Sequence, residues 1–249
     1  MSGVRRDLRG RRALVTGAAR RLGRAIALAL AESGADLVIH YRESRDDAES
    51  LAEEARRMGR QAVCVPGELG RPGGAEDFVA AVRKVVDRLD ILVNNVGVFH
   101  LEPLDSMRTD LFRETLEANL VAPQVLIRDL TGLFPDRGGH VINIGFAGAQ
   151  ALRPYPQATA YQASKAGLHL LTRSWAQKLA PRGIRVNTVS PGHLENSVEL
   201  PLEPEKISLL GRAGRLDEVV EALMYLLDPD SWITGTEIEV AGGWLGSQS

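Results

Sequence analysis

Short apolar runs alternate with longer amphipathic stretches along the whole chain. The apolar runs predict strands at residues 13–15, 37–39, 62–65, 91–93, 141–144, 184–189 and 237–240. Between them, apolar residues recur at helical spacing and predict helices around Leu22–Leu30 and over about 45–58, 75–88, 108–130, 160–179 and 216–227. Pro123 is expected to disturb the longest of these helices.

Strands that are apolar throughout and separated by helices are typical of a parallel sheet whose two faces are both covered. The sequence therefore predicts an α/β fold with one doubly wound parallel sheet of about seven strands. No repeat, linker or low-complexity segment divides the pattern, so residues 1–249 are expected to form a single domain.

Composition excludes several classes of function. Hydrophobic residues make up 44% and charged residues 25% of the chain, and the net charge is −2. This balance is ordinary for a globular protein and offers no basic surface for nucleic acid. No apolar run approaches the ~20 residues that span a bilayer, and the arginine-rich start lacks the apolar stretch of a signal peptide. We therefore expect a cytoplasmic protein with neither nucleic-acid nor membrane partners, and no residue pattern calls for a metal.

A glycine-bearing turn joins the first strand to the first helix. Gly17 ends the strand, and Gly23 lies in the first turn of the helix, after Arg20, Arg21 and Leu22. Backbone amides in such a turn, together with the helix dipole, favour a bound phosphate. The turn predicts a nucleotide site of the Rossmann type, although a tight turn without a ligand would have the same glycines.

Tyr161 and Lys165 are spaced i and i+4 on a predicted helix, so they share one face. A tyrosine pKa begins near 10 and must fall by about 3 units for the phenol to exchange protons readily near pH 7. An ammonium group about 4 Å away supplies on the order of 4 kcal/mol at an effective dielectric of 20, which is about enough. The pair predicts a tyrosine acid activated by a lysine.

These motifs together resemble the classical short-chain dehydrogenase/reductase family over nearly the whole chain. The matching segments are Thr16-Gly17 to Gly23, Asn94-Asn95-Val96-Gly97, Asn119, the Tyr161/Lys165 pair and Pro191-Gly192. The Ala-Ala-Arg-Arg-Leu-Gly turn, with His40-Tyr41-Arg42 after it, looks like pteridine reductases. The rest is similar to 3-oxoacyl-carrier-protein reductases.

The resemblance implies NADP(H) as the cofactor. Arg21 stands where the family usually has a glycine, and no acidic residue ends the second strand, where Tyr41 and Arg42 lie near Ser44. Arg21, Arg42 and Ser44 are expected to converge on a 2′-phosphate, because guanidinium pairs well with phosphate. Arg20 is either a further contact or a solvent-facing residue.

Further roles follow from the same resemblance. It places Lys165 on the nicotinamide ribose and Asn119 on a water that feeds protons through Lys165. The remaining predicted cofactor contacts are Glu68, Leu69, Asn95, Gly97, Pro191, Gly192 and Asn196, the last in place of the usual threonine.

The family's serine after the fifth strand is absent. Counting forward from the strand puts Phe146 at its position, and counting back from Tyr161 gives Gly148; neither has a hydroxyl. The aspartate that pteridine reductases carry there is absent too. Three explanations stay open: the enzyme is slow on simple ketones, Tyr155, Thr159 or a water supplies a substitute donor, or the substrate does not need one.

The sequence thus predicts an NADPH-dependent reductase that transfers hydride to a carbonyl or C=N carbon of a small molecule, 3-oxoacyl-like or a generic ketone. A pteridine-type reductase is the alternative, and an NADPH-binding sensor or impaired subunit is the alternative of another class. Phe99, His100, Phe146, Tyr155 and His193 are the expected substrate contacts, with a substrate loop at about 193–212. The resemblance also implies a homo-oligomer, tetramer or dimer, with Trp175 and Trp244 in packing or subunit contacts.

Overall fold

Seven parallel strands form the centre of the computed structural model, which describes residues 6–197 and 208–244. Their order across the sheet is β3-β2-β1-β4-β5-β6-β7. The strands are β1 Arg12–Val15, β2 Asp36–Tyr41, β3 Ala62–Pro66, β4 Ile91–Asn94, β5 Gly139–Ile144, β6 Ile184–Pro191 and β7 Glu237–Val240. Every strand predicted from an apolar run is present, and the predicted fold class is confirmed.

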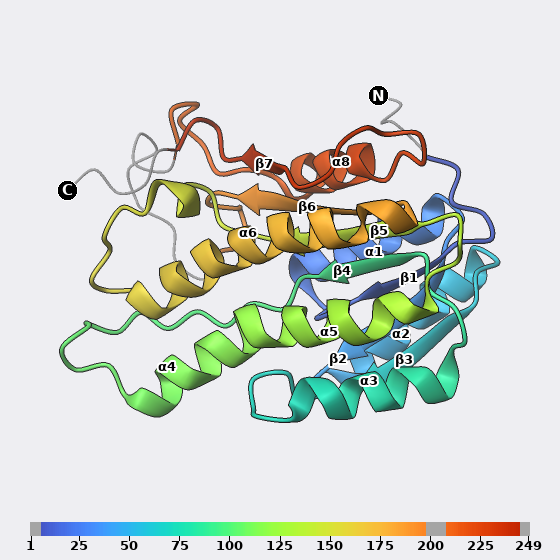
Figure 1. Ribbon diagram of the computed structural model, residues 1–249, viewed down its shortest axis with the longest axis horizontal. Helices are drawn as coiled ribbons and strands as arrows, with labels where there is room; N and C mark the ends of the chain where they lie inside the picture. The colour runs from blue at the N-terminus through green and yellow to red at the C-terminus, as the bar shows by residue number, and fades with distance from the viewer. Residues whose placement is uncertain (1–5, 198–207, 245–249) are drawn as a thin grey trace.

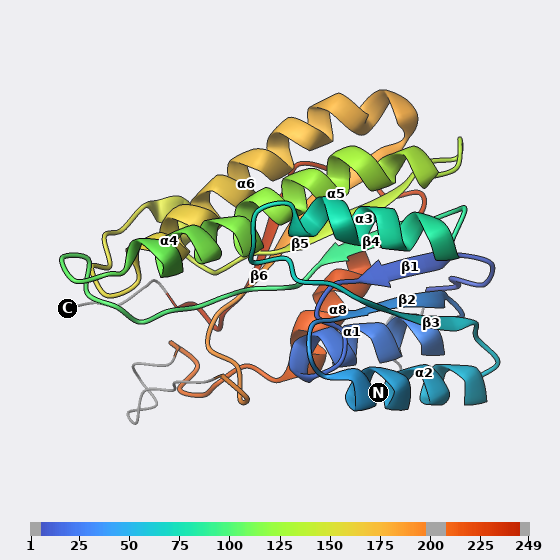
Figure 2. The ribbon, with the colours of Figure 1, turned by 90° about the horizontal axis from the view of Figure 1, so that it is seen from below.

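Helices cover both faces of the sheet (Figures 1 and 2). One face carries α3 Gly74–Val85, α5 Ala122–Leu130 and α6 Thr159–Leu179, and the other carries α1 Arg21–Glu32, α2 Arg45–Arg57 and α8 Leu216–Leu226. Successive residues of a strand point to opposite faces, so Leu14 packs into the core under α3 and α5 whereas Ala13 and Val15 pack under α1 and α2.

The long helix predicted over 108–130 is divided. It consists of α4 Thr109–Leu116, a π-helical turn at Glu117–Val121, and α5. Pro123 has no amide hydrogen and cannot donate the α-helical bond to the carbonyl of Asn119, which explains why the disturbance falls in the turn before the proline. The prediction over 75–88 was wrong at its end, because Val86 is already extended (φ −141°) and continues into the core without helix.

The strand order reverses direction between β1 and β4, which are paired at the centre of the sheet. In doubly wound folds, ligands bind at the carboxyl ends of the strands beside such a point. The loop after β4 runs toward the loop after β5, where the amides of Glu102 and Leu104 donate to the carbonyls of Gln157 (2.8 Å) and Pro156 (2.9 Å). Both loops lie at the end of the molecule where α4 begins (left in Figure 1).

Candidate active site

The glycine turn after β1 is closely packed. Gly17 has φ +62°, and a Cβ atom at Gly23 would lie 2.2 Å from the Gly17 carbonyl oxygen, so position 23 requires glycine. Asn95 holds the turn from β4: its amide nitrogen donates to the hydroxyl of Thr16 and its side-chain nitrogen to the carbonyl of Thr16, both at 2.8 Å. Asn95 therefore supports the turn itself.

His40 is a part of this site that sequence reasoning did not assign. The amide of Gly17 donates to His40 Nδ1 (2.8 Å), so Nε2 carries the hydrogen and donates to the carbonyl of Gly67 (3.1 Å). Burial lowers the pKa of His40 to about 4, so the ring is neutral at pH 7. A histidine inside the apolar run of β2 was the available signal, because a buried polar side chain requires partners.

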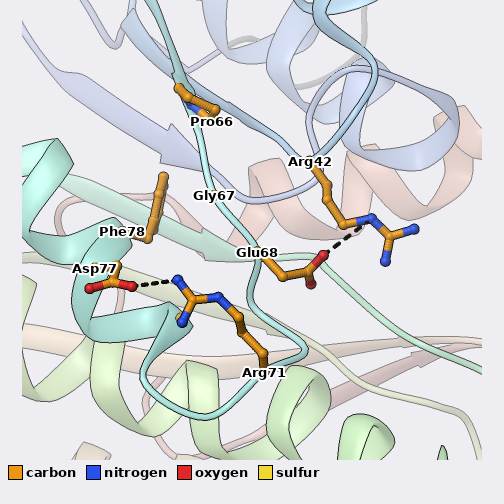
Figure 3. Close-up of a pocket in the computed structure, with 8 residues that line it drawn as sticks. Arg42, Pro66, Gly67, Glu68, Arg71, Asp77 and Phe78 are labelled. Atoms are coloured by element: carbon orange, nitrogen blue, oxygen red, sulfur yellow. Dashed lines mark hydrogen bonds and ion pairs between the residues drawn. The ribbon is translucent and has the colours of Figure 1, made fainter.

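The predicted phosphate clamp is present only in part. Arg21 is exposed, has φ +51°, and forms no hydrogen bond or ion pair with any residue that the structure describes. Arg20 instead binds Asp47 (Nε–Oδ2 2.6 Å). Ser44 precedes α2, but its side chain makes no capping bond. Arg42 turns its guanidinium toward Glu68 (Nε–Oε2 3.6 Å), so among these residues Arg21 alone is an uncompensated cation (Figure 3).

A cavity of about 340 Å³ opens beside Arg42 and Glu68 (Figure 3). Gly67, Arg71, Asp77 and Phe78 contribute to its wall, and Arg71 pairs with Asp77. Glu68 accepts a bond from the amide of Gly70 (2.9 Å). Three other predicted cofactor contacts differ in exposure: Leu69 is buried, Leu22 packs partly into the core, and Tyr41 is half-buried at the end of β2.

Lys165 and Tyr161 lie together at the start of α6, as predicted from their spacing. Lys165 is buried, donates to the carbonyl of Ile144 at the end of β5 (2.8 Å), and lies 5.6 Å from the centre of the Tyr161 ring. Gly97 approaches the same ammonium, since a Cβ there would be 3.7 Å from Lys165 Nζ. Burial lowers the pKa of Lys165 to about 8.

The pKa of Tyr161 departs from the sequence-based expectation. In the protein alone, burial raises the pKa of the Tyr161 phenol above its usual value near 10, because the phenolate would lose its solvation. Lys165 is directed at the Ile144 carbonyl and does not form a hydrogen bond with the phenol in this structure. The phenol is therefore protonated at pH 7, which is the form that a proton donor to a carbonyl under reduction requires.

Asn119 lies in the π-helical turn and is fully buried. Its side-chain oxygen accepts from the amide of Val98 (2.7 Å), and its side-chain nitrogen donates to the Val98 carbonyl (2.9 Å) and the Ser164 hydroxyl (3.1 Å). Because the side chain is saturated, the backbone carbonyl, which Pro123 leaves without its helical donor, is the group of Asn119 able to hold a water.

Phe146, not Gly148, packs against the tyrosine. The rings of Phe146 and Tyr161 meet edge to face with centroids 5.3 Å apart, and Phe99 meets Tyr161 in the same way at 5.0 Å. Trp244 in turn packs against Phe146, with ring centroids 5.2 Å apart. Sequence reasoning did not place Trp244 here, because it lies far along the chain and only packing brings it to the loop after β5.

The remaining predicted contacts are divided between the site and its surroundings. His193 contacts Trp244 (5.3 Å between centroids), whereas His100 binds Glu114 of α4 (3.2 Å). Tyr155 is half-buried in the loop before α6, where Thr159 donates its hydroxyl to the Tyr155 carbonyl (3.3 Å).

Pro191 and Gly192 fasten the loop after β6. The Pro191 carbonyl accepts from Ala147 (3.1 Å), and the amide of Gly192 donates to Val240 (3.1 Å). Asn196 is half-buried and has no side-chain hydrogen bond within the described residues. Of the predicted substrate loop, 193–197 and 208–212 are described, and 198–207 lie outside the described residues.

Among the described residues, no group of three or more His, Cys, Asp or Glu side chains is arranged to hold a metal ion. Within the same part of the chain, no helix has both the length and the apolarity to cross a membrane.

The fold and these residues together define a nucleotide-dependent α/β oxidoreductase. The profile of a family described as Enoyl-(Acyl carrier protein) reductase matches residues 17–245. The chain is 32% identical to 3-oxoacyl-[acyl-carrier-protein] reductase FabG of Staphylococcus epidermidis, over 93% of this chain and 97% of the relative. It is 30% identical to an L-rhamnose 1-dehydrogenase (NAD(P)(+)) of a Sphingomonas strain, over 95% and 96%.

Solved structures agree with these relatives. The angucycline C-6 ketoreductase LanV, crystallised with NADP, has a TM-score of 0.86 at 31% identity, over 96% of this chain and 97% of that one. A blue fluorescent protein from a metagenomic library, in complex with NADPH, has a TM-score of 0.88 at 32% identity, over 96% and 99%. The chain belongs to the short-chain dehydrogenase/reductase family and is an NAD(P)-dependent oxidoreductase acting on CH–OH and C=O groups.

Proposed function

We propose that the protein catalyses NADPH-dependent reduction of a carbonyl group in a small molecule. The observation that carries this proposal is the grouping of a protonated Tyr161 phenol, the buried ammonium of Lys165 and the open end of the glycine turn at one end of the sheet. When bound, NADPH supplies the hydride. Gly17, Gly23, Asn95 and Gly97 shape a turn that suits a dinucleotide, and its close packing requires glycine at position 23, where a Cβ atom would meet the Gly17 carbonyl oxygen.

The residues have separate roles in this proposal. Tyr161 donates its proton to the carbonyl oxygen, and Lys165 holds the ribose and favours the phenolate that remains. The backbone carbonyl of Asn119 holds the water through which Lys165 recovers a proton.

The preference for NADPH rests on charge. Arg21 has no partner among the described residues, so it is free to meet a 2′-phosphate, and Arg42 is held nearby by Glu68. Of the substrates, a 3-oxoacyl-like or generic ketone is favoured over a pterin. The arginine turn resembles pteridine reductases, but Phe146 stands where those enzymes carry an aspartate.

An NADPH sensor is the second candidate, and the ring of Phe146 against Tyr161 is the observation that favours it. A sensor would bind NADPH and transfer no hydride.

NADPH oxidation, followed by absorbance, distinguishes the two. The acceptors are β-ketoacyl thioesters, diketones, quinones, cyclic imines, dihydropterins and aryl ketones, with NADH in parallel. We expect turnover with NADPH on at least one class and a loss of about 10²–10⁴-fold in Tyr161→Phe. Tyr225→Phe, on the exposed face of α8, is the matched control and should retain the wild-type rate. NADPH binding without oxidation of any acceptor would establish the sensor, and near-full turnover by Tyr161→Phe would refute the mechanism.

A further inference from the structure

A chain of aromatic rings surrounds the predicted proton donor. Phe99 and Phe146 both meet the Tyr161 ring edge to face, Trp244 meets Phe146, and His193 meets Trp244, with all four centroid distances between 5.0 and 5.3 Å. The rings come from the loops after β4, β5 and β6 and from the segment after β7. Tyr161 thus presents its hydroxyl within an aromatic wall.

Part of this wall is open to solvent. Phe99 is 43% exposed, and Leu209, 75% exposed, lies against Gly243 beside Trp244. Contiguous exposed apolar surface around a catalytic group marks a ligand site. Aromatic rings favour flat aromatic partners in offset or edge-to-face contact, at centroid separations of about 4.5–7 Å.

Among the described residues, the two rings that contact Tyr161, Phe99 and Phe146, carry no hydroxyl to donate to a carbonyl oxygen, and the Tyr155 ring makes no contact with either of them. Three hydroxyls close to Phe146 in the fold are already committed: Ser164 donates to the Tyr161 carbonyl (2.6 Å), Thr159 to the Tyr155 carbonyl (3.3 Å), and Ser190 to Glu237. Ser190 lies directly under Gly145, where a Cβ atom would meet its oxygen. Apart from the Tyr161 phenol, this wall offers aromatic rings to a bound carbonyl compound.

We propose that the substrate is a flat aromatic ketone bearing a hydroxyl next to its carbonyl, so that an internal hydrogen bond supplies the donor that Phe146 lacks. This inference rests on the proposed reductase function and narrows its substrate. The aromatic wall binds the ring system, and the substrate's own O–H stabilises the charge that develops on the carbonyl oxygen.

The reaction balances without a further reactant. The hydride of NADPH, with its electron pair, bonds to the carbonyl carbon, and the π electrons of the C=O bond move to oxygen. That oxygen takes the proton of Tyr161, so the ketone is reduced to a secondary alcohol and NADPH is oxidised to NADP⁺. The neighbouring hydroxyl keeps its own proton throughout.

A matched set of ketones tests the inference: α-tetralone with a peri hydroxyl, the methyl ether of that compound, and unsubstituted α-tetralone. The ether retains the ring and the electron donation of the hydroxy compound and adds one methylene, but has no O–H; unsubstituted α-tetralone controls for the added bulk. We expect kcat/KM with NADPH to be at least tenfold higher for the hydroxy ketone than for the ether, since one oxyanion donor typically contributes about 10²–10³-fold.

Variants at Phe146 provide the second arm. Phe146→Ser restores a donor and should accelerate the ether and the unsubstituted ketone, closing most of the gap. Phe146→Ala opens the same space without a hydroxyl and should leave the gap as in the wild type. Thermal melting verifies that each variant is folded, and the wild-type comparison decides the question if one is not.

The outcomes separate this inference from the function on which it rests. Equal wild-type rates on the hydroxy ketone and its ether would overturn the inference, as would turnover of other carbonyl classes with none of the tetralones. NADPH consumption by no acceptor at all would instead overturn the reductase function.

Discussion

Replacing His40 with phenylalanine should loosen the cofactor turn. His40 joins two segments that border the predicted nucleotide site: the Gly17 amide donates to Nδ1 (2.8 Å), and Nε2 donates to the Gly67 carbonyl (3.1 Å). A phenyl ring keeps the aromatic contact with Phe78, which packs edge to face on His40 at 4.6 Å, but it offers neither an acceptor nor a donor. The substitution therefore removes two hydrogen bonds while conserving most of the packing.

Two magnitudes follow from the structure. An unsatisfied buried polar group costs about 1–3 kcal/mol, so leaving both the Gly17 amide and the Gly67 carbonyl without a partner should lower the free energy of unfolding by about 2–6 kcal/mol at pH 7.5. Loss of one bond at the turn corresponds to roughly tenfold weaker NADPH binding, since about 1.4 kcal/mol is a factor of ten.

His40 also makes the wild type sensitive to acid. Its pKa falls from 6.5 to about 4 on folding, so the unfolded chain takes up the proton first and stability is lost as pH falls from 6.5 toward 4. A shift of that size corresponds to about 3 kcal/mol at one unit per ~1.4 kcal/mol. His40→Phe should lack this loss.

Urea unfolding at pH 7.5, 5.5 and 4.5, together with NADPH titration followed by fluorescence, measures both effects. The matched control is His140→Phe: burial likewise lowers the pKa of His140 to about 4, but His140 lies in β5 away from the turn. The control should lose the same acid sensitivity and keep the wild-type NADPH affinity. Unchanged NADPH affinity in His40→Phe would refute the role assigned to the Gly17 bond.

Three further predictions address the turn, the lysine and the core. Gly23→Ala should weaken NADPH binding by more than about tenfold, because its Cβ would lie 2.2 Å from the Gly17 carbonyl; Gly132→Ala, with nothing within 4 Å, should bind normally in the same titration. The rate of ketone reduction should fall as pH rises through about 8, where Lys165 loses its proton, and a pH profile flat to pH 10 would contradict the charge role of that lysine. Asp90 is buried among Arg11, Arg88 and Arg137, so Asp90→Asn should lower the free energy of unfolding, measured in urea, by about 2–4 kcal/mol. The Asp87 side chain is 97% exposed, so Asp87→Asn should change that free energy by less than about 0.5 kcal/mol.

The strands were predictable because each is a compact apolar run that stays apolar on both faces. The ends of the helices were less predictable than the strands. Val86 and Leu89 continue the helical spacing of α3 and are buried, yet they pack as extended chain leading to β4, so apolar spacing alone could not show where the helix ends. The π-helical turn was expected only as a disturbance at Pro123, because a missing amide predicts a defect but not its geometry.

The site was predictable where one short segment carries the chemistry, as in the Tyr161/Lys165 pair and the glycine turn. It was not predictable where the partner is distant in the sequence. Arg20 finds Asp47, Arg42 finds Glu68, and His100 finds Glu114, and each of these contacts depends on how two elements pack. The expected fall in the Tyr161 pKa was wrong in direction for the protein alone, since burial, which raises that pKa, depends on the fold. Oligomeric state and cytoplasmic location stay predictions.

The strand order also determines when, during synthesis, each part of the sheet can pair. β1 pairs with β2 on one side and β4 on the other, so the centre of the sheet stays half-finished until the ribosome, at roughly 5–20 residues per second, has made β4. The nucleotide turn can then close, while β7 and Trp244 are still to come. The residues of the nucleotide turn, up to Gly97, are therefore synthesised before Phe146, His193 and Trp244 of the aromatic wall.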